Sequence, residues 1–202
     1  MKNRKLFKKY NKGSHWEVSN NGYADEFILF LRDKLNVPRS EENNVIVIDL
    51  GCGKGKDVVR FNQAYTPALG FDKDSALISF AKRSHYKYRS NFFVYDIEKL
   101  PYDNNTRKAF FCINVMHYVD QRKVLEEIYR TLIPGGYAFI HFNLLIVDQD
   151  YYIDYHQSKS DIYVLLKDFK IIREKIFTRE DPKPIPHTHH IMQLISQKPF
   201  AK

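Results

Sequence analysis

The stretch VIVIDLGCGKGKDVVR, residues 45–60, decides the fold of this chain. Apart from Asp49, residues 45–50 are apolar on both faces, as in a central strand of a parallel sheet. Alternate glycines follow at Gly51, Gly53 and Gly55. Without a Cβ, they allow a tight turn and let backbone amides approach a ligand closely. A helical pattern begins at Lys56, and this order of strand, turn and helix predicts a ligand site at the turn.

Length and composition indicate an ordinary folded protein. The 202 residues are 44% hydrophobic and 15% aromatic, which excludes general disorder. No run approaches the roughly 18 apolar residues of a membrane helix, and no apolar segment behind the charged N-terminus resembles a secretory signal. Cys52 and Cys112 fall in or beside predicted buried strands. Two reduced thiols in a cytoplasmic protein is the simplest interpretation.

The net charge of +8 is concentrated near the N-terminus. Residues 1–40 hold nine Lys or Arg against four Asp or Glu, counted from the sequence. With Phe7, Tyr10 and Trp16 interleaved, this basic arm could follow a phosphate backbone. A lysine-rich solvated face is the alternative interpretation.

Helical and strand patterns alternate along the chain. Helices are expected at residues 23–35, 56–65, 75–83, 120–132 and 150–167. Strands are expected at residues 45–50, 68–71, 91–95, 109–115, 137–142, 169–177 and 189–197. The alternation predicts an α/β fold with a Rossmann-like, doubly wound sheet of seven strands, the first six mainly parallel. Residues 178–188 are too few for a helical crossover, so the last strand should be antiparallel.

The acidic residues around the glycine turn narrow the ligand class. Asp72 lies 21 positions after Gly51, at the end of the second strand, where a carboxylate can accept both ribose hydroxyls. A dinucleotide fingerprint would need glycine at position 56, where the chain has Lys56. Asp49 would repel a pyrophosphate but tolerate a cationic ligand.

Five ordered motifs over residues 45–142 carry a family resemblance. They are IDLGCGKGKD (48–57), LGFDKD (69–74), YDIEKLPYDNNT (95–106), FFCINVMHYV (110–119) and LIPGGYAFIHF (132–142). Together they resemble the class I S-adenosylmethionine-dependent methyltransferases. The resemblance implies S-adenosyl-L-methionine as cofactor and in-line methyl transfer to an O, N or C atom of an acceptor.

The resemblance also implies a set of cofactor-binding residues. These are Asp49, Gly51, Gly53, Asp72, Lys73, Asp96, Ile97 and Asn114. The two glycines would line the methionine portion of the cofactor, and Asp72 would hold its ribose. Asp96 would accept from the adenine amino group beside Ile97, and Asn114 would lie below the sulfonium.

The catalytic residues are not identified by the sequence. Methyl transfer from a sulfonium depends mostly on alignment, and a base is needed only when the acceptor must lose a proton. His117 and His187 are candidates for substrate contact. His187 and His189 should lie on one face of the last strand, with His190 on the other. No nearby Cys or paired carboxylate supplies a third ligand, so no metal is predicted.

The chain is expected to be one domain. Residues 1–40 would form the basic arm and a helix, 45–142 the cofactor-binding core, and 143–202 a substrate-side helix and the terminal strand pair. A small-molecule acceptor is the leading hypothesis, with no membrane partner. One alternative is an RNA (tRNA) methyltransferase that uses the basic arm and HYKYR (85–89). The other is a cofactor-binding sensor or scaffold without catalysis. The sequence does not specify the acceptor or the oligomeric state.

Overall fold

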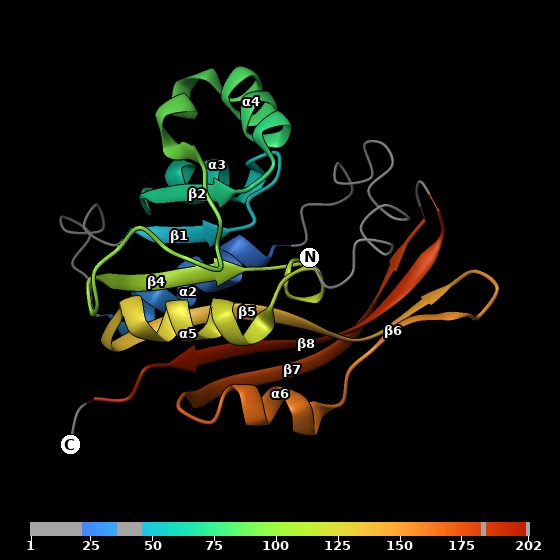
Figure 1. Cartoon of the computed structure of the whole chain (residues 1–202). Coiled ribbons are helices and arrows are strands. Elements are labelled where there is room, and N and C mark those ends of the chain that lie inside the picture. The colour runs from blue at the N-terminus through green and yellow to red at the C-terminus, as the bar shows by residue number, and fades with distance from the viewer. Residues whose placement is uncertain (1–21, 36–45, 183–184, 201–202) are drawn as a thin grey trace.

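The computed structural model describes residues 22–35, 46–182 and 185–200. All strands in these ranges join a single sheet in the order β3-β2-β1-β4-β5-β8-β7, with β6 paired to β5 (Figure 1). Of the predicted basic arm and helix (residues 1–40), residues 1–21 and 36–40 fall outside the described residues.

The elements follow the expected alternation of helices and strands. The strands are β1 (Val47–Leu50), β2 (Ala68–Asp72), β3 (Phe92–Val94), β4 (Arg107–Cys112), β5 (Leu132–Asp148), β6 (Ile153–His156), β7 (Lys170–Asp181) and β8 (His187–Gln197). The α-helices are α2 (Tyr23–Lys34), α3 (Lys56–Gln63), α4 (Ser75–Ser84), α5 (Gln121–Thr131) and α6 (Lys159–Leu165). Two short 3₁₀ helices are η3 (Tyr86–Asn91) and η4 (Met116–Tyr118). No helix among these is long and apolar enough to cross a membrane.

The strand directions confirm the predicted sheet. Strands β3, β2, β1, β4 and β5 pair in parallel. Strand β8 is antiparallel to both of its neighbours, β5 and β7. Strand β8 therefore lies between the fifth and sixth predicted strands. Because β8 is antiparallel to both neighbours, β7 runs in the same direction as the parallel strands.

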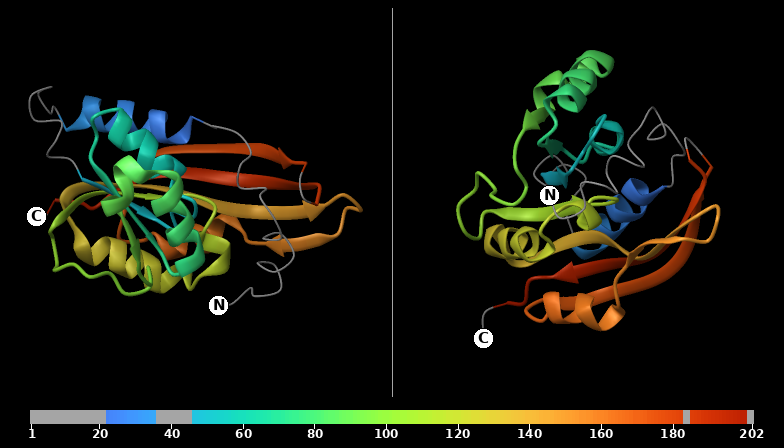
Figure 2. Two further views of the ribbon diagram at one scale, coloured as in Figure 1. Left: turned by 90° about the horizontal axis from the view of Figure 1, so that it is seen from above. Right: turned by 45° about the vertical axis from the view of Figure 1, so that its right-hand side comes forward.

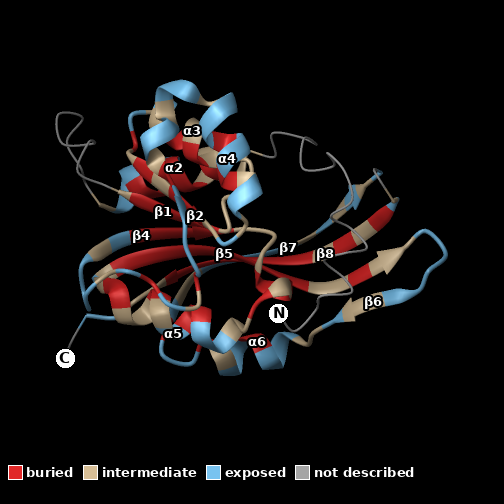
Figure 3. Cartoon of the chain, turned by 45° about the horizontal axis from the view of Figure 1, so that its top comes forward, coloured by how far each residue is buried: buried red, intermediate tan, exposed pale blue. Residues whose placement is uncertain are grey.

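Helices cover both faces of the sheet (Figure 2). Helices α2, α3 and α4 contribute to one buried cluster, and α5 and α6 contribute to the other. Val47 enters the first cluster and Ile48 the second, which explains why β1 is apolar on both sides. The buried residues follow the sheet and the inner helix faces (Figure 3).

The helix expected over residues 150–167 is wrong in its first half. Strand β5 continues to Asp148, and the chain turns back as β6, antiparallel to it. The Asp148 carboxylate accepts from the amides of Asp150 (3.0 Å) and Tyr152 (2.9 Å), which stabilises the turn. Helix α6 begins only after Ser158, whose side chain forms a capping box with Asp161. The polar and aromatic composition of residues 150–158 hid the strand pairing.

The last two strands are longer than expected. Strand β7 reaches Asp181 and β8 starts at His187, so the predicted loop over residues 178–188 shrinks to 182–186. Asp181 pairs with His187 in the register of this hairpin. The sequence of residues 178–181 resembles a loop because Thr178 and Glu180 are exposed, and Arg179 and Asp181 face polar partners instead of the apolar core.

Candidate functional site

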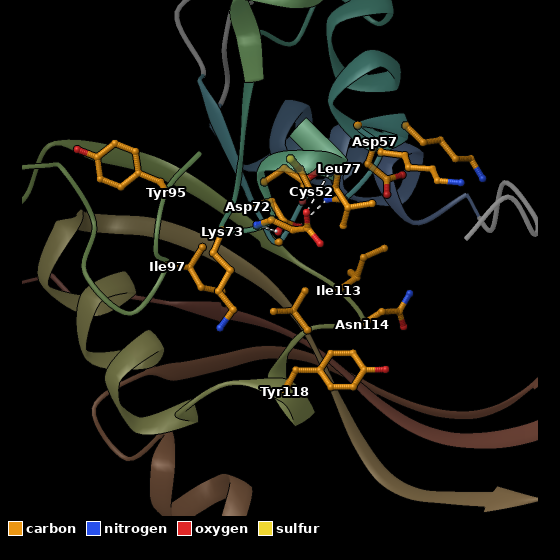
Figure 4. Close-up of a pocket in the computed structure, with 18 of the residues that line it drawn as sticks. Cys52, Asp57, Asp72, Lys73, Leu77, Tyr95, Ile97, Ile113, Asn114 and Tyr118 are labelled. Carbon is orange, nitrogen blue, oxygen red and sulfur yellow. Dashed lines mark hydrogen bonds between the residues drawn. The ribbon is translucent and has the colours of Figure 1, made fainter. Parts of the chain in front are cut away.

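A cavity of about 400 Å³ lies at the carboxyl ends of the parallel strands. The strand order reverses between β1 and β4, and the loops that follow these strands form much of its wall. Figure 4 shows side chains from the β1, β2 and β4 loops facing this space, with Tyr118 from η4 below them. The switch point of an open parallel sheet is the usual place for a ligand.

The glycine turn forms one wall of the cavity. The amides of Gly51 and Cys52 both donate to the carbonyl of Phe71, at 2.7 and 3.0 Å, which ties the turn to β2. Gly51 has φ +73°, and a Cβ there would lie 2.3 Å from Cγ2 of Val115. Gly53 has φ +52°, but a Cβ would meet no protein atom within 4 Å. Packing against Val115 therefore requires glycine at position 51, whereas a Cβ at position 53 would enter open space beside the cavity.

Asp72 connects the turn to the next helix. Its Oδ2 accepts from the amide of Gly53 at 3.0 Å, and its Oδ1 accepts from the amide of Asp74 at 2.9 Å. Asp74 in turn caps α4 through Ala76 and Leu77. The Asp72 carboxylate is therefore fixed at the edge of the cavity before any ligand binds.

Three carboxylates line the cavity, those of Asp49, Asp57 and Asp72, and each is negatively charged when ionised. Burial raises the pKa of Asp49 well above its ordinary value, and repulsion from Asp57 and Asp72 adds to the rise. Burial also raises the pKa of Asp57, to about 6. Burial likewise raises the pKa of Asp72, despite hydrogen bonds from Asp74 and Gly53 that lower it. A cation in this cavity would stabilise all three ionised groups, whereas a pyrophosphate would be repelled.

The sequence of this region matches a known family. Residues 48–140, which include the glycine turn and the loops after β2 and β4, match a family model described as a methyltransferase domain. Residues 48–140 are therefore a methyltransferase domain.

Curated relatives of this methyltransferase differ in their named substrates. An uncharacterized protein of Methanocaldococcus jannaschii is 27% identical over 158 residues, which cover 78% of the chain and 62% of that protein. A phthiotriol/phenolphthiotriol dimycocerosates methyltransferase of Mycobacterium tuberculosis is 31% identical over 45% of the chain and 35% of its own length. A tRNA U34 carboxymethyltransferase of Campylobacter curvus is 29% identical over 57% of the chain and 40% of its own length. The chain thus spans between a third and two thirds of these relatives.

Solved structures share the fold of the methyltransferase. One is a SAM-dependent methyltransferase of Methanosarcina mazei, with a TM-score of 0.66 and 18% identity. The match covers 77% of this chain and 93% of that one. At this identity the similarity establishes the fold alone.

Most of the expected cofactor residues line the cavity. They are Asp49, Gly51, Gly53, Asp72, Lys73, Ile97 and Asn114. Asp96 does not belong to the lining: it is exposed, and its Oδ1 accepts from the amide of Glu98 at 3.0 Å. Tyr95, the residue before it, lines the cavity instead. The lining residues that sequence reasoning did not select include Tyr23, Asp57 and Leu77.

His117 lies behind the cavity wall. Its ring packs on Tyr118 with centroids 3.8 Å apart, and its Nδ1 lies 2.7 Å from Nδ2 of Asn143. Only 3% of His117 is exposed, and it does not line the cavity. Its ring neighbour Tyr118 lines the cavity instead.

A second group of polar side chains, here called the hairpin cluster, consists of Asp181, His187 and His189. The Nε2 atoms of His189 and His187 lie 3.3 and 3.7 Å from Oδ2 of Asp181. Both histidines are 5% exposed, whereas His190 is half-buried on the other face, as expected from the sequence. Burial lowers the pKa of His189 to about 4. The sequence predicts no nearby Cys or paired carboxylate as a third ligand, and the longer β7 is what brings the Asp181 carboxylate there.

Arg179 connects the hairpin cluster to the cavity. Its guanidinium donates to both oxygens of Asp181, at 3.0 and 2.8 Å, and to Oδ1 of Asn114 at 2.8 Å. Asn114 lines the cavity and has φ +58°, a left-handed conformation that Asn adopts more readily than most residues. Sequence reasoning missed both Arg179 and Asp181 because residues 178–188 were interpreted as a loop.

Proposed function

We propose that this methyltransferase binds S-adenosyl-L-methionine over the glycine turn and methylates a small-molecule acceptor. In this proposal Asp72 holds the ribose, Ile97 packs beside the adenine, and Asn114 lies near the sulfonium. The three carboxylates that line the cavity, Asp49, Asp57 and Asp72, carry the proposal, because in their ionised form they favour a cationic ligand. When bound, the cofactor supplies an activated methyl group to an acceptor held in line with its sulfonium.

The chain's own residues would orient the cofactor and supply negative charge around it. The open face of Gly53 leaves room for the methionine portion, and Asp72 is already oriented by two backbone amides. Asp49 and Asp57 would stabilise the positive charges of the cofactor. Lys73, which lines the cavity, and Asp96, which follows the lining residue Tyr95, complete the proposed cofactor contacts. A direct contact between an acceptor and His117 or His187 stays a prediction.

Cofactor affinity should depend on pH. Because the pKa of Asp57 is about 6 in the free protein, this carboxylate gains a proton as the pH falls through that value. Each protonation removes a negative charge that would face the cationic cofactor. We expect the dissociation constant to rise about threefold or more from about pH 7.5 to about pH 5.5.

Calorimetric titrations across this range check the expectation. Adenosine, which lacks both cationic groups of the cofactor, should bind with little pH dependence. The variant Asp57→Asn should flatten the profile for the full cofactor. An equally steep profile in Asp57→Asn would exclude Asp57 as the titrating group.

Methyl transfer can be tested with radiolabelled S-adenosylmethionine and a cell extract. The proposal expects label in the small-metabolite fraction. Label confined to RNA would instead favour the tRNA hypothesis. Tight cofactor binding with no label in any fraction would favour a sensor or scaffold.

An RNA acceptor is the second candidate, and the relative named as a tRNA U34 carboxymethyltransferase favours it. The basic segment Lys2–Lys12 and residues 85–89 would then contact phosphates. Affinity for tRNA should fall steeply with added salt if these contacts form. Weak binding that is insensitive to salt would exclude this function.

We also infer a cytoplasmic location from the two free thiols, Cys52 and Cys112.

A further inference from the structure

The hairpin cluster has the donor set of a transition-metal site. One ring nitrogen from each of His187 and His189 and one carboxylate oxygen of Asp181 lie within 4.8 Å of one another. They come from adjacent strands, because Asp181 pairs with His187 at the start of β8 and His189 follows on the same face. Two imidazoles and one carboxylate are ligands that Zn²⁺ and its first-row neighbours prefer.

Both imidazoles are oriented by their other nitrogen. Nδ1 of His187 lies 2.6 Å from the carbonyl oxygen of Ile185, and Nδ1 of His189 lies 2.9 Å from Oδ1 of Asn143. These oxygens only accept, so each Nδ1 carries the proton, and each neutral ring presents its Nε2 lone pair toward Asp181. Metal-binding histidines are held in this way by second-shell carbonyl or carboxylate groups.

The distances from Asp181 to the two imidazoles fit one shared ion. Zinc bonds of about 2.0–2.1 Å at a tetrahedral angle place neighbouring ligand atoms about 3.4 Å apart. Oδ2 of Asp181 lies 3.3 Å from Nε2 of His189 and 3.7 Å from Nε2 of His187. Small side-chain rotations would bring all three atoms within bonding distance of the same point.

The surrounding charges are compatible with a divalent ion. Arg179 donates to both Asp181 oxygens but leaves further lone pairs on each, so it would act as an outer-shell partner. Asp154, on β6, adds a second negative charge that acts on His187. With the rings neutral, a +2 ion would face these two carboxylates and one guanidinium.

We propose that Asp181, His187 and His189 bind one divalent transition-metal ion of the Zn²⁺ class. Three protein ligands leave at least one coordination position for water or another ligand, as in catalytic rather than structural zinc sites. The link through Arg179 to Asn114 places this ion beside the cavity. The proposal does not depend on methyl transfer, since it rests on the hairpin cluster alone.

Metal titration of the full chain, carrying no polyhistidine tag, tests the proposal. After chelator treatment, the protein should bind one equivalent of Zn²⁺ in competition with a fluorescent zinc indicator. His187→Gln and His189→Gln should each weaken this binding about 100-fold or more, because each removes a ligand. His190→Gln is the matched control and should bind as the wild type does, since His190 lies on the opposite face.

Circular dichroism of each variant separates ligand loss from unfolding. Weaker Zn²⁺ binding in a glutamine variant that keeps the wild-type spectrum supports the proposal. If one of the two variants, His187→Gln or His189→Gln, fails to fold, the other provides an independent test. A visible Co²⁺ spectrum that disappears in His189→Gln would add support. The proposal is overturned if the wild type shows no saturable binding of one equivalent, or if both folded glutamine variants bind Zn²⁺ like the wild type.

Discussion

Gly51→Ala should unfold the protein at a markedly lower temperature and abolish cofactor binding. A Cβ at this position meets Cγ2 of Val115 at 2.3 Å, and the backbone has φ +73°. The left-handed conformation alone costs about 1–2 kcal/mol, and the clash adds to it. A combined loss of about 3 kcal/mol would lower the melting temperature by about 6–12 °C for a chain of this size.

Gly53→Ala should weaken cofactor binding strongly while it lowers the stability of the fold only moderately. At φ +52° it carries a similar backbone cost, but its Cβ meets no protein atom within 4 Å. We therefore expect a smaller loss of stability, about 1–2 kcal/mol, together with a large loss of cofactor affinity, because the methyl group would point toward the proposed cofactor.

Thermal melting and calorimetry of three alanine variants check both expectations. Gly22→Ala is the matched control: Gly22 has φ +70°, open space around its Cβ and no part in the cavity lining. It should lose stability as Gly53→Ala does, yet bind the cofactor normally. Normal cofactor binding by Gly53→Ala would show that the ligand does not lie over the turn.

Asp72→Ala should weaken S-adenosylmethionine binding about tenfold or more, which is about 1.4 kcal/mol. The substitution removes the proposed charge-assisted hydrogen bonds to the ribose. It also removes the acceptors for the amides of Gly53 and Asp74, so the turn itself loses support. Both effects act in the same direction.

Calorimetric titration of Asp72→Ala measures this effect. Asp103→Ala, at an exposed position that does not line the cavity, is the control and should bind like the wild type. Unchanged affinity in Asp72→Ala would remove Asp72 from the site.

The parallel half of the fold could be predicted from the sequence because its signals are local. An apolar run followed by alternate glycines is enough to place β1 and the turn, and Asp72 follows at the end of β2. Most of the proposed cofactor contacts lie in these loops, so the cavity lining includes them.

The antiparallel extension could not be predicted in the same way. Pairing of β6 with β5 depends on a distant partner, and its short polar and aromatic sequence fits a helix equally well. Arg179 and Asp181 resemble loop residues until β8 pairs with them and buries the histidines. The hairpin cluster therefore depends on register, which no single segment encodes.

Direct titration of the wild-type chain with S-adenosyl-L-methionine tests whether the cavity binds this cofactor. We expect saturable binding at one site with a dissociation constant on the order of micromolar, and no comparable binding of NAD⁺. This expectation would be contradicted if S-adenosylmethionine gave no binding at millimolar concentration while NAD⁺ saturated the cavity.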